Sequence, residues 1–325
     1  MPPLIELLKL ISSEKVFSVE DLAIHFACSV EDIRLLLQKI NEDTEFVTTD
    51  DQGYLQWADF AAPLDASRIK FFLGASQEKF FIDVVSRTGS TNTDLLTLAR
   101  EGLLKDRQVR LAEIQEGGRG SKSRSWVAIP RGSIALSVAR IPQKQVVGID
   151  LSIMPLIVGL AVAKTLRGLH TADIKLKWPN DVVSGGKKLG GILVEAVSSG
   201  SQNSQFVIGL GLNLNFPRAV MEEIDQPITH LLASGVDVDR NELISQLLLA
   251  IDEELTRLEN GDAKGLIKEW NTYHYYQGRE VQFRLPDESV TVGRVLEVDA
   301  SGAILLETKA GVLSFHSGEI SFLKV

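Results

Sequence analysis

The sequence is poor in cysteine, histidine and aromatic residues. Its 325 residues include one cysteine, Cys28, five histidines and 6% aromatic side chains. A single thiol excludes an internal disulfide, and the histidines stand at no recognised metal-ligand spacing. We therefore expect no fixed metal site in the protein and a reducing, cytoplasmic environment.

Long apolar runs are also missing. The longest apolar stretch, residues 151–163, contains Ser152, Pro155 and Gly159 and ends before Lys164. It is shorter than the roughly 20 apolar residues that a membrane-spanning helix needs. The first residues, Met-Pro-Pro-Leu-Ile-Glu, have neither the basic region nor the cleavage site of an export signal. We predict that the protein has no membrane segment.

The remaining composition is that of a globular chain, with 44% hydrophobic and 24% charged residues. Its net charge of −9 is unevenly spread along the chain. Residues 1–62 hold twelve acidic and four basic residues, a net charge of −8, which leaves −1 for the other 263 residues. The N-terminal fifth of the chain is therefore strongly acidic.

Residues 1–62 have the pattern of a winged helix-turn-helix module. Apolar residues recur there at helical spacing, Ser18 with Asp21 predicts a capping box, and Ser29 precedes a further helix. Two short apolar segments around a polar turn then predict a hairpin. The predicted elements are helices over 4–11, 18–26 and 29–40 and strands over 46–49 and 53–57.

The acidic charge of this module argues against DNA binding. A nucleic-acid reader needs lysine and arginine against the phosphates, whereas the would-be recognition helix opens with Glu31 and Asp32. If the module does bind operator DNA, the contacts should come from Ser29, Arg34 and Gln38. Two interpretations stay open, a DNA-binding module and a vestigial, protein-docking or structural one.

The rest of the chain predicts a mixed α+β architecture. Residues 63–79 read as a linker, and residues 80–275 alternate strand and helix signals. Residues 276–325 change to short alternating strands separated by turn residues, which predicts a small all-β barrel.

A strand at residues 109–113 runs into a loop that ends at Trp126. This loop holds three glycines and three cations, so that backbone N–H groups and basic side chains could neutralise an anion. It lacks the ending of a P-loop. A plain solvated loop is the alternative.

A second segment, residues 175–195, predicts two strands joined by a glycine-lysine turn. Pro179 breaks the first strand and leaves Asn180 and Asp181 free to hydrogen-bond or to associate with magnesium. Lys188 stands beside strand residues that must be buried, so its ammonium needs an anionic partner unless it is a solvated hairpin lysine.

Two shorter signals complete the pattern. The Gly-x-Gly of Gly209 and Gly211 has no third glycine and no following helix, so we exclude a dinucleotide fingerprint and expect close approach of a ligand instead. Ser90, Thr91 and Asn92 follow a strand and either bind a small polar group or cap a helix.

Taken in this order, the segments resemble the bacterial biotin protein ligases whose N-terminal winged helix doubles as a biotin-operon repressor. The most specific marks are Lys-Trp-Pro-Asn-Asp at 177–181 and the segment at 187–195. The resemblance covers essentially the whole chain. It implies a winged helix-turn-helix, a central class II synthetase-like mixed sheet with helices, and a C-terminal SH3-like barrel.

The resemblance also implies a two-step reaction. The carboxylate of biotin attacks the α-phosphate of Mg-ATP to give biotinyl-5′-AMP and pyrophosphate, and a lysine of the biotin carboxyl carrier domain of acetyl-CoA carboxylase, or of a similar carrier, then displaces AMP. Magnesium enters with ATP. The family further implies ligand-linked homodimers.

By position in the family pattern, Lys188 and Arg119 carry the chemistry, and Gly211 helps to line the pocket. The residues expected to bind biotin are Ser90, Thr91, Asn92, Gln115, Arg119, Gly120, Ser121, Lys188 and Gly191. The residues expected to bind the adenylate are Arg119, Arg124, Trp126, Lys177, Asn180, Asp181, Gly209 and Asn213.

The loop departs from the family pattern Gly-Arg-Gly-Arg-x-Gly-Arg, because Ser121 replaces the second arginine and Ser123 the last glycine. This predicts weaker retention of the adenylate unless Lys122 or Arg124 substitutes. The alternatives to a biotin ligase are a lipoate-type ligase of the same superfamily and a non-catalytic biotin sensor and repressor.

Overall fold

The computed structural model describes residues 2–12, 15–58, 62–121, 124–142, 152–169, 173–199 and 202–322. Its N-terminal unit has three helices and a two-stranded antiparallel hairpin, as predicted. These are α1 (Leu4–Ile11), α2 (Val19–His25), α3 (Val30–Ile40), β1 (Val47–Thr49) and β2 (Leu55–Trp57). Capping boxes begin α2 and α3, with Ser18 and Ser29 each paired with the aspartate three residues later.

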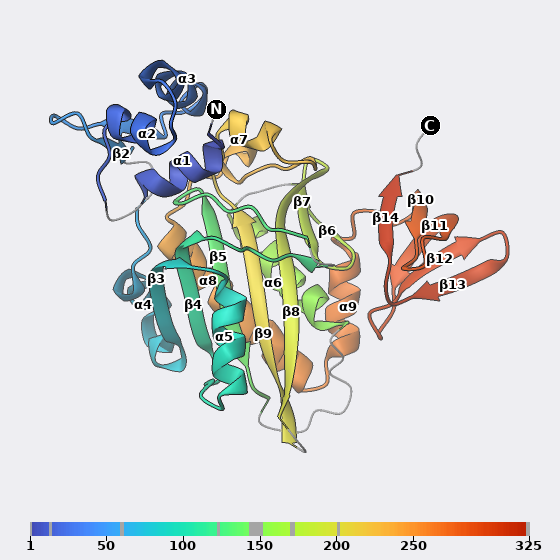
Figure 1. The fold of residues 1–325 in the computed structure, drawn as a ribbon. Coiled ribbons are helices and arrows are strands. Elements are labelled where there is room, and N and C mark those ends of the chain that lie inside the picture. The colour runs from blue at the N-terminus through green and yellow to red at the C-terminus, as the bar shows by residue number, and fades with distance from the viewer. Residues whose placement is uncertain are drawn as a thin grey trace.

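A seven-stranded mixed sheet forms the centre of the molecule (Figure 1). Its strands are β3 (Phe81–Thr88), β4 (Gln108–Gln115), β5 (Ser133–Arg140), β6 (Ile174–Lys177), β7 (Asp181–Ser184), β8 (Lys187–Ser199) and β9 (Gln202–Asn213). The order is β3-β4-β5-β9-β8-β7-β6, in which β3 pairs parallel with β4 and every other neighbour is antiparallel. The predicted hairpin around the glycine-lysine turn is the β7–β8 pair.

Helices cover both faces of this sheet. Helix α5 (Thr91–Arg100) packs on one face, where Leu95 and Leu96 meet Val207 of β9. The helices α6 (Met154–Gly168), α8 (Arg240–Glu259) and α9 (Ala263–Asn271) lie behind the other face in Figure 1 and share its large apolar core.

Residues 63–79 differ from the linker that we expected. They hold α4 (Ala66–Leu73) and a 3-10 helix (Gly74–Lys79), and α4 contacts α8. Ile69 and Leu73 are buried in the central core, so apolar burial turns this segment into part of the central domain.

The C-terminal residues form a five-stranded antiparallel sheet. Its strands are β10 (Glu280–Arg284), β11 (Val290–Val298), β12 (Ile304–Thr308), β13 (Gly311–Phe315) and β14 (Glu319–Phe322). The order is β13-β12-β11-β10-β14.

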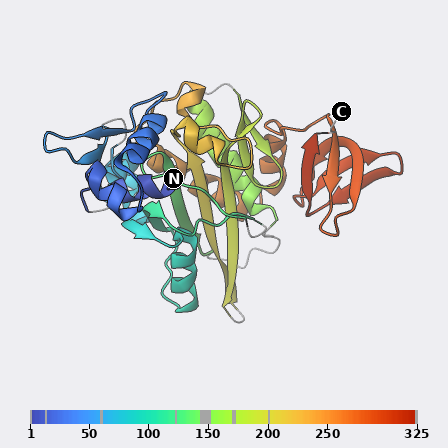
Figure 2. The ribbon, with the colours of Figure 1, turned by 45° about the horizontal axis from the view of Figure 1, so that its top comes forward.

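The N-terminal unit and the C-terminal sheet lie on opposite sides of the central domain (Figure 2). Helices α1 and α3 contact α7 (Arg218–Glu222), and Ile129, Phe216 and Val220 join the apolar core of the N-terminal unit. Within the described residues, no helix is long and apolar enough to span a bilayer.

Candidate active site

A pocket opens on the α5 face of the central sheet, above the first turn of α5. Its floor is formed by β5, β8 and β9. Residues 119–121 and 124–126 of the loop cover it, and residues 318–320 of the C-terminal sheet close one side. The pocket brings together most of the predicted site residues from distant parts of the sequence. Those that line it are Ser90, Thr91, Asn92, Gln115, Arg119, Gly120, Ser121, Arg124, Trp126, Lys177, Asn180, Asp181, Lys188, Gly191, Gly209 and Gly211.

One end of the pocket is a buried polar cluster. Gln115 Oε1 accepts a hydrogen bond from the backbone N–H of Thr91 (3.1 Å), and Ser137 Oγ donates to Asn92 Oδ1 (2.6 Å). The side chain of Ser90 makes no capping hydrogen bond, although Ser90 precedes α5. Helix capping alone therefore does not account for this cluster, whose polar groups lie side by side on the pocket wall.

The small residues of β9 make room for the protein's own side chains. A Cβ on Gly211 would lie 2.3 Å from the indole ring of Trp126, and a Cβ on Gly209 would lie 2.4 Å from Asn92 Oδ1. We expected these glycines to admit a ligand. They let Trp126 and Asn92 lie against the strand, where both side chains face the pocket, and the close approach of a ligand stays a prediction.

The described residues of the loop, 117–121 and 124–126, are hydrogen-bonded to each other. Gly120 N donates to Arg124 O (2.7 Å), and Trp126 N donates to Gly118 O (2.8 Å). These bonds fold the loop over the pocket and direct Arg119 and Trp126 toward it. The predicted substitutes Lys122 and Ser123 lie outside the described residues.

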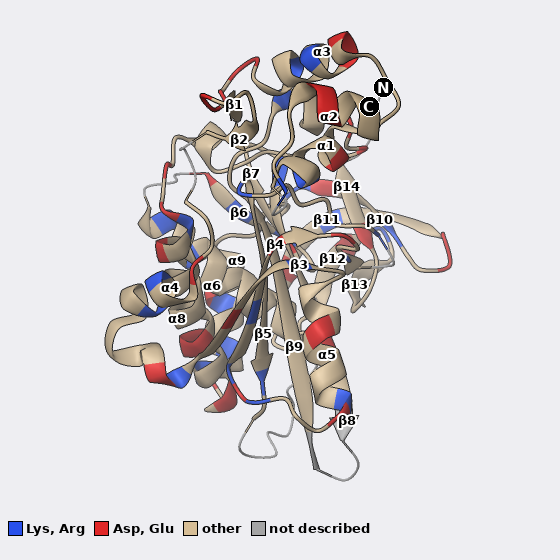
Figure 3. Cartoon of the chain, turned by 60° about the vertical axis from the view of Figure 1, so that its left-hand side comes forward, with Lys and Arg blue, Asp and Glu red and all other residues tan. Residues whose placement is uncertain are grey.

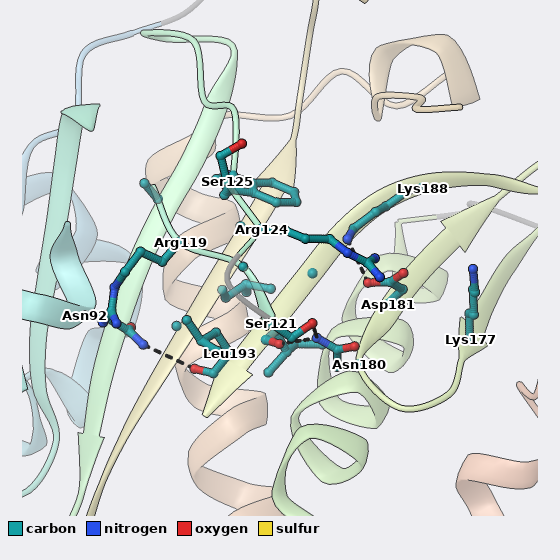
Figure 4. A pocket seen from close by; sticks show the side chains of 18 of the residues that line it. Asn92, Arg119, Ser121, Arg124, Ser125, Lys177, Asn180, Asp181, Lys188 and Leu193 are labelled. Atoms are coloured by element: carbon teal, nitrogen blue, oxygen red, sulfur yellow. Dashed lines mark hydrogen bonds and ion pairs between the residues drawn. The ribbon is translucent and has the colours of Figure 1, made fainter. Parts of the chain in front are cut away.

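Lys188 has an anionic partner, as its environment required. Its Nζ lies 2.8 Å from Asp181 Oδ1, both side chains are 18% exposed, and the ammonium lies 5.6 Å from the centre of the Trp126 ring. Asp181 supplies this anionic partner in the structure (Figure 4), and contact of Lys188 with a bound acid stays a prediction.

Further cations surround this end of the pocket. Burial lowers the pKa of Lys177, opposed by Asp181 and reinforced by the neighbouring Lys188 and Arg124. Asn180 Nδ2 donates to Ile192 O (2.7 Å), which ties the Trp-Pro-Asn-Asp turn to β8. The arrangement gives a basic end and a neutral polar end joined by a glycine floor.

Arg124 reaches across the mouth of the pocket and forms an ion pair with Glu319 of β14. Both side chains are partly exposed, at 56% and 42%. The C-terminal sheet therefore supplies part of the pocket wall, which the sequence did not reveal.

Comparison with known proteins agrees with this geometry. Residues 84–213 match the Biotin/lipoate A/B protein ligase family, and residues 276–323 match the Biotin protein ligase C terminal domain. The chain is 34% identical over 270 residues to the Biotin–[acetyl-CoA-carboxylase] ligase of Mycobacterium tuberculosis, covering 81% of this chain and 97% of that protein. The chain belongs to the biotin protein ligase family.

Other members of the biotin protein ligase family show the same relationship. The Bifunctional ligase/repressor BirA of Escherichia coli is 32% identical over 233 residues, covering 71% of each protein. The biotin protein ligase of Aquifex aeolicus, solved in complex with biotin and ATP, superposes with a TM-score of 0.63 at 28% identity over 74% of this chain and 97% of that one.

Asn213 is one predicted site residue that does not line the pocket. Its side chain is buried and Nδ2 donates to Thr229 O (2.9 Å), because the end of β9 holds the following segment in place. Conversely, the sequence reasoning missed Ser137, Glu195 and Glu319, whose partners lie in distant segments.

Proposed function

We propose that this member of the biotin protein ligase family is an ATP-dependent biotin ligase. In the first step the carboxylate of biotin attacks the α-phosphate of ATP, which forms biotinyl-5′-AMP and releases pyrophosphate. In the second step the ε-amine of a carrier lysine attacks the acyl carbon and AMP leaves. The observation that carries the proposal is one pocket with a neutral polar end, a basic end and a covering loop.

The polar end is suited to the ureido ring of biotin. Thr91, Asn92 and Gln115 offer both donors and acceptors from a rigid cluster, and Ser90 adds a hydroxyl. The backbone of Gly191 continues the pocket floor toward the basic end. Biotin would thus lie along β8 with its acid group toward Lys188.

The basic end is suited to two anions that must react with each other. Lys188 can take the carboxylate and then the α-phosphate, while Arg119, Arg124 and Lys177 offset the remaining charge. Trp126 would cover the adenylate and exclude water from the mixed anhydride. Magnesium would enter with ATP, where Asn180 and Asp181 offer oxygen ligands.

The acceptor that we propose is a lysine on a biotin carboxyl carrier domain. The match of residues 276–323 to the Biotin protein ligase C terminal domain favours biotin over lipoate. We also propose a winged helix-turn-helix over 1–62, a class II synthetase-like domain over 80–275 to which the helices of 63–79 add, and an SH3-like barrel over 276–325. The cytoplasmic location and the homodimer stay predictions.

A biotin-transfer assay tests the function. Purified protein, biotin, Mg-ATP and a carrier domain should give one biotinylated lysine, and Lys188→Ala should lower the rate about 100-fold or more. Lys187→Ala, the exposed neighbour in the same turn, is the matched control. Label on bystander lysines would mean that Ser121 lets the adenylate escape, and no label at all would contradict the assignment.

For the N-terminal unit we propose a structural or docking role rather than operator binding. Acidic segments mark the β1–β2 turn and the start of α3 (Figure 3), and α3 contacts α7. Arg34 and Gln38 are exposed, whereas Ser29 Oγ is hydrogen-bonded to Asp32 (2.6 Å). A gel shift with operator-like DNA, biotin and ATP tests this, because a sensor and repressor must bind and a ligase need not.

A further inference from the structure

The carboxylate of Glu195 lies just beyond the pocket lining and accepts three N–H hydrogen bonds. Arg119 donates from Nη1 to Oε1 (3.1 Å) and from Nη2 to Oε2 (2.7 Å), and Asn92 Nδ2 donates to Oε2 (2.9 Å). A two-pronged guanidinium–carboxylate pair is the strong, directional form of an ion pair. Glu195 therefore fixes one residue of the covering loop and one residue of the polar cluster at the same time.

The strand geometry places this ion pair far from Lys188. Gly191, Leu193 and Glu195 are two positions apart along β8 and therefore lie on the same face of the sheet. A Cβ on Gly191 would lie 3.4 Å from Lys188 Nζ, so Gly191 marks the basic end. Four residues of strand, about 13 Å, separate it from Glu195. In Figure 4 Arg119 points toward Asn92, away from Lys188.

Arginine keeps its charge in proteins, so its guanidinium must be paired with some anion or with water. In the state described here that anion is Glu195, and the Arg119 side chain is 43% exposed. A rotation of this partly exposed side chain would bring the guanidinium toward the basic end when an acid group arrives there. Such a move exchanges one carboxylate or phosphate partner for another.

We propose that Glu195 is a positioning residue that holds Arg119, and with it the covering loop, over the polar end of the pocket, and that the acid group of the ligand competes with Glu195 for Arg119. The identity of that ligand rests on the proposed function. Asn92 keeps its hydrogen bond to Glu195 throughout. The polar cluster thus stays oriented while the loop cation changes partner.

The first test needs no ligand. Glu195→Gln keeps an acceptor oxygen for Asn92 but removes the charge that holds Arg119. In limited tryptic digestion of the ligand-free protein, cleavage after Arg119 should become about three- to fivefold faster, as expected for loss of a partly exposed pair. Glu101→Gln, an exposed carboxylate just beyond the other end of α5, is the matched control.

Mass spectrometry would follow the fragment ending at Arg119, and cleavage after Arg257 in α8 would serve as the reference for global unfolding. Equal cleavage rates after Arg119 in Glu195→Gln and in the wild type overturn the proposal. Faster cleavage at both arginines would also overturn it, because the effect would then be on the whole fold.

The second test measures the competition. Calorimetry with biotin and with biotin amide, which lacks the charge, should show that Glu195→Gln binds biotin about three- to fivefold more tightly relative to the amide. This gain should vanish in the Arg119→Ala background. If the gain persists there, or if the variant weakens both compounds, the competition is refuted. If the wild type binds neither compound, the proposed function fails while the digestion still decides the role of Glu195.

Discussion

The N-terminal unit and the C-terminal sheet both contact the central domain, but the ion pairs that join them differ in exposure. The N-terminal junction includes Lys9, whose side chain is 9% exposed and whose Nζ lies 3.0 Å from Glu116, the residue after Gln115. The C-terminal junction at the pocket is the Arg124–Glu319 pair, in which both side chains are partly exposed. The Lys9 ammonium is buried although Glu116 is 40% exposed, whereas both partners of the Arg124–Glu319 pair are partly exposed.

This difference indicates different contributions to the site. No residue of the N-terminal unit within 2–12 and 15–58 lines the pocket. Lys9 nevertheless forms an ion pair with Glu116, where β4 ends and the loop begins. Residues 318–320 of the C-terminal sheet do line the pocket. The N-terminal unit therefore supports the root of the loop, whereas the C-terminal sheet can exchange contacts with the loop itself.

The largest effect should come from the apolar part of the C-terminal junction. Trp178 is 2% exposed, its Nε1 donates to Gly302 O (3.0 Å), and its ring meets Phe283. Trp178→Ala should lower the free energy of unfolding by about 3–5 kcal/mol, measured by urea denaturation. Leu313→Ala, on the exposed strand β13, should change it little. Equal losses would contradict this account of the junction.

The second-largest effect should be a loss of unfolding free energy at low pH, which arises at the same C-terminal junction. His274 lies between α9 and β10, is 5% exposed, and burial lowers its pKa to about 3. The unfolded chain, with an ordinary histidine pKa near 6.5, binds the proton more readily, so stability should fall by roughly 1 kcal/mol per pH unit below that value. Unfolding curves between pH 7 and 4.5 should show a shallower fall in His274→Phe, since His230 shifts in the same direction in both proteins.

The buried cation of the N-terminal junction should matter less. Lys9→Met keeps the packing of the side chain but removes its pairs with Glu6 and Glu116. Because both carboxylates are partly exposed and can be solvated, the loss of unfolding free energy should be about 1 kcal/mol. Lys39→Met, exposed at the end of α3, is the control in thermal melts. A loss of 3 kcal/mol or more, about the cost of stranding a buried charge, would show that the acids cannot reach water.

The smallest effect should appear at the exposed pair. Glu319→Gln releases Arg124 for phosphate and should lower the KM for ATP by about fivefold at most at low salt. The difference should disappear near about 0.5 M salt, where exposed charges are screened. An unchanged or higher KM at low salt would mean that Glu319 supports the pocket rather than competing for Arg124.

Local patterns in the sequence predicted the elements with clear boundaries. The caps at Ser18 and Ser29 and the turn before Lys187 define helices and a hairpin that the structure confirms. Strand β5 escaped prediction because it is buried on both faces and shows no alternation of polar and apolar residues. Helix α4 was read as linker because its apolar face packs mainly on α8, far along the chain.

In the site, too, local patterns were predicted and contacts between distant segments were not. The segments that carry Lys188, Arg119 and Asn92 were found because glycines and polar residues are unusual beside apolar strands. Their partners were not found, since Glu195 is 76 positions from Arg119 in the sequence and stands in an apolar strand. A pairing made only by the folded sheet leaves no local pattern to read.

The contact between Trp126 and Gly211 has an optical consequence. The chain has four tryptophans, and three of them, Trp57, Trp178 and Trp270, are at most 6% exposed in apolar cores. Trp178 also reaches the pocket wall, but Trp126 is the partly exposed one, and an ammonium lies 5.6 Å from the centre of its ring. Its emission should therefore respond to any ligand that moves Lys188 or covers the indole, so the enzyme carries a fluorescent reporter of its own occupancy.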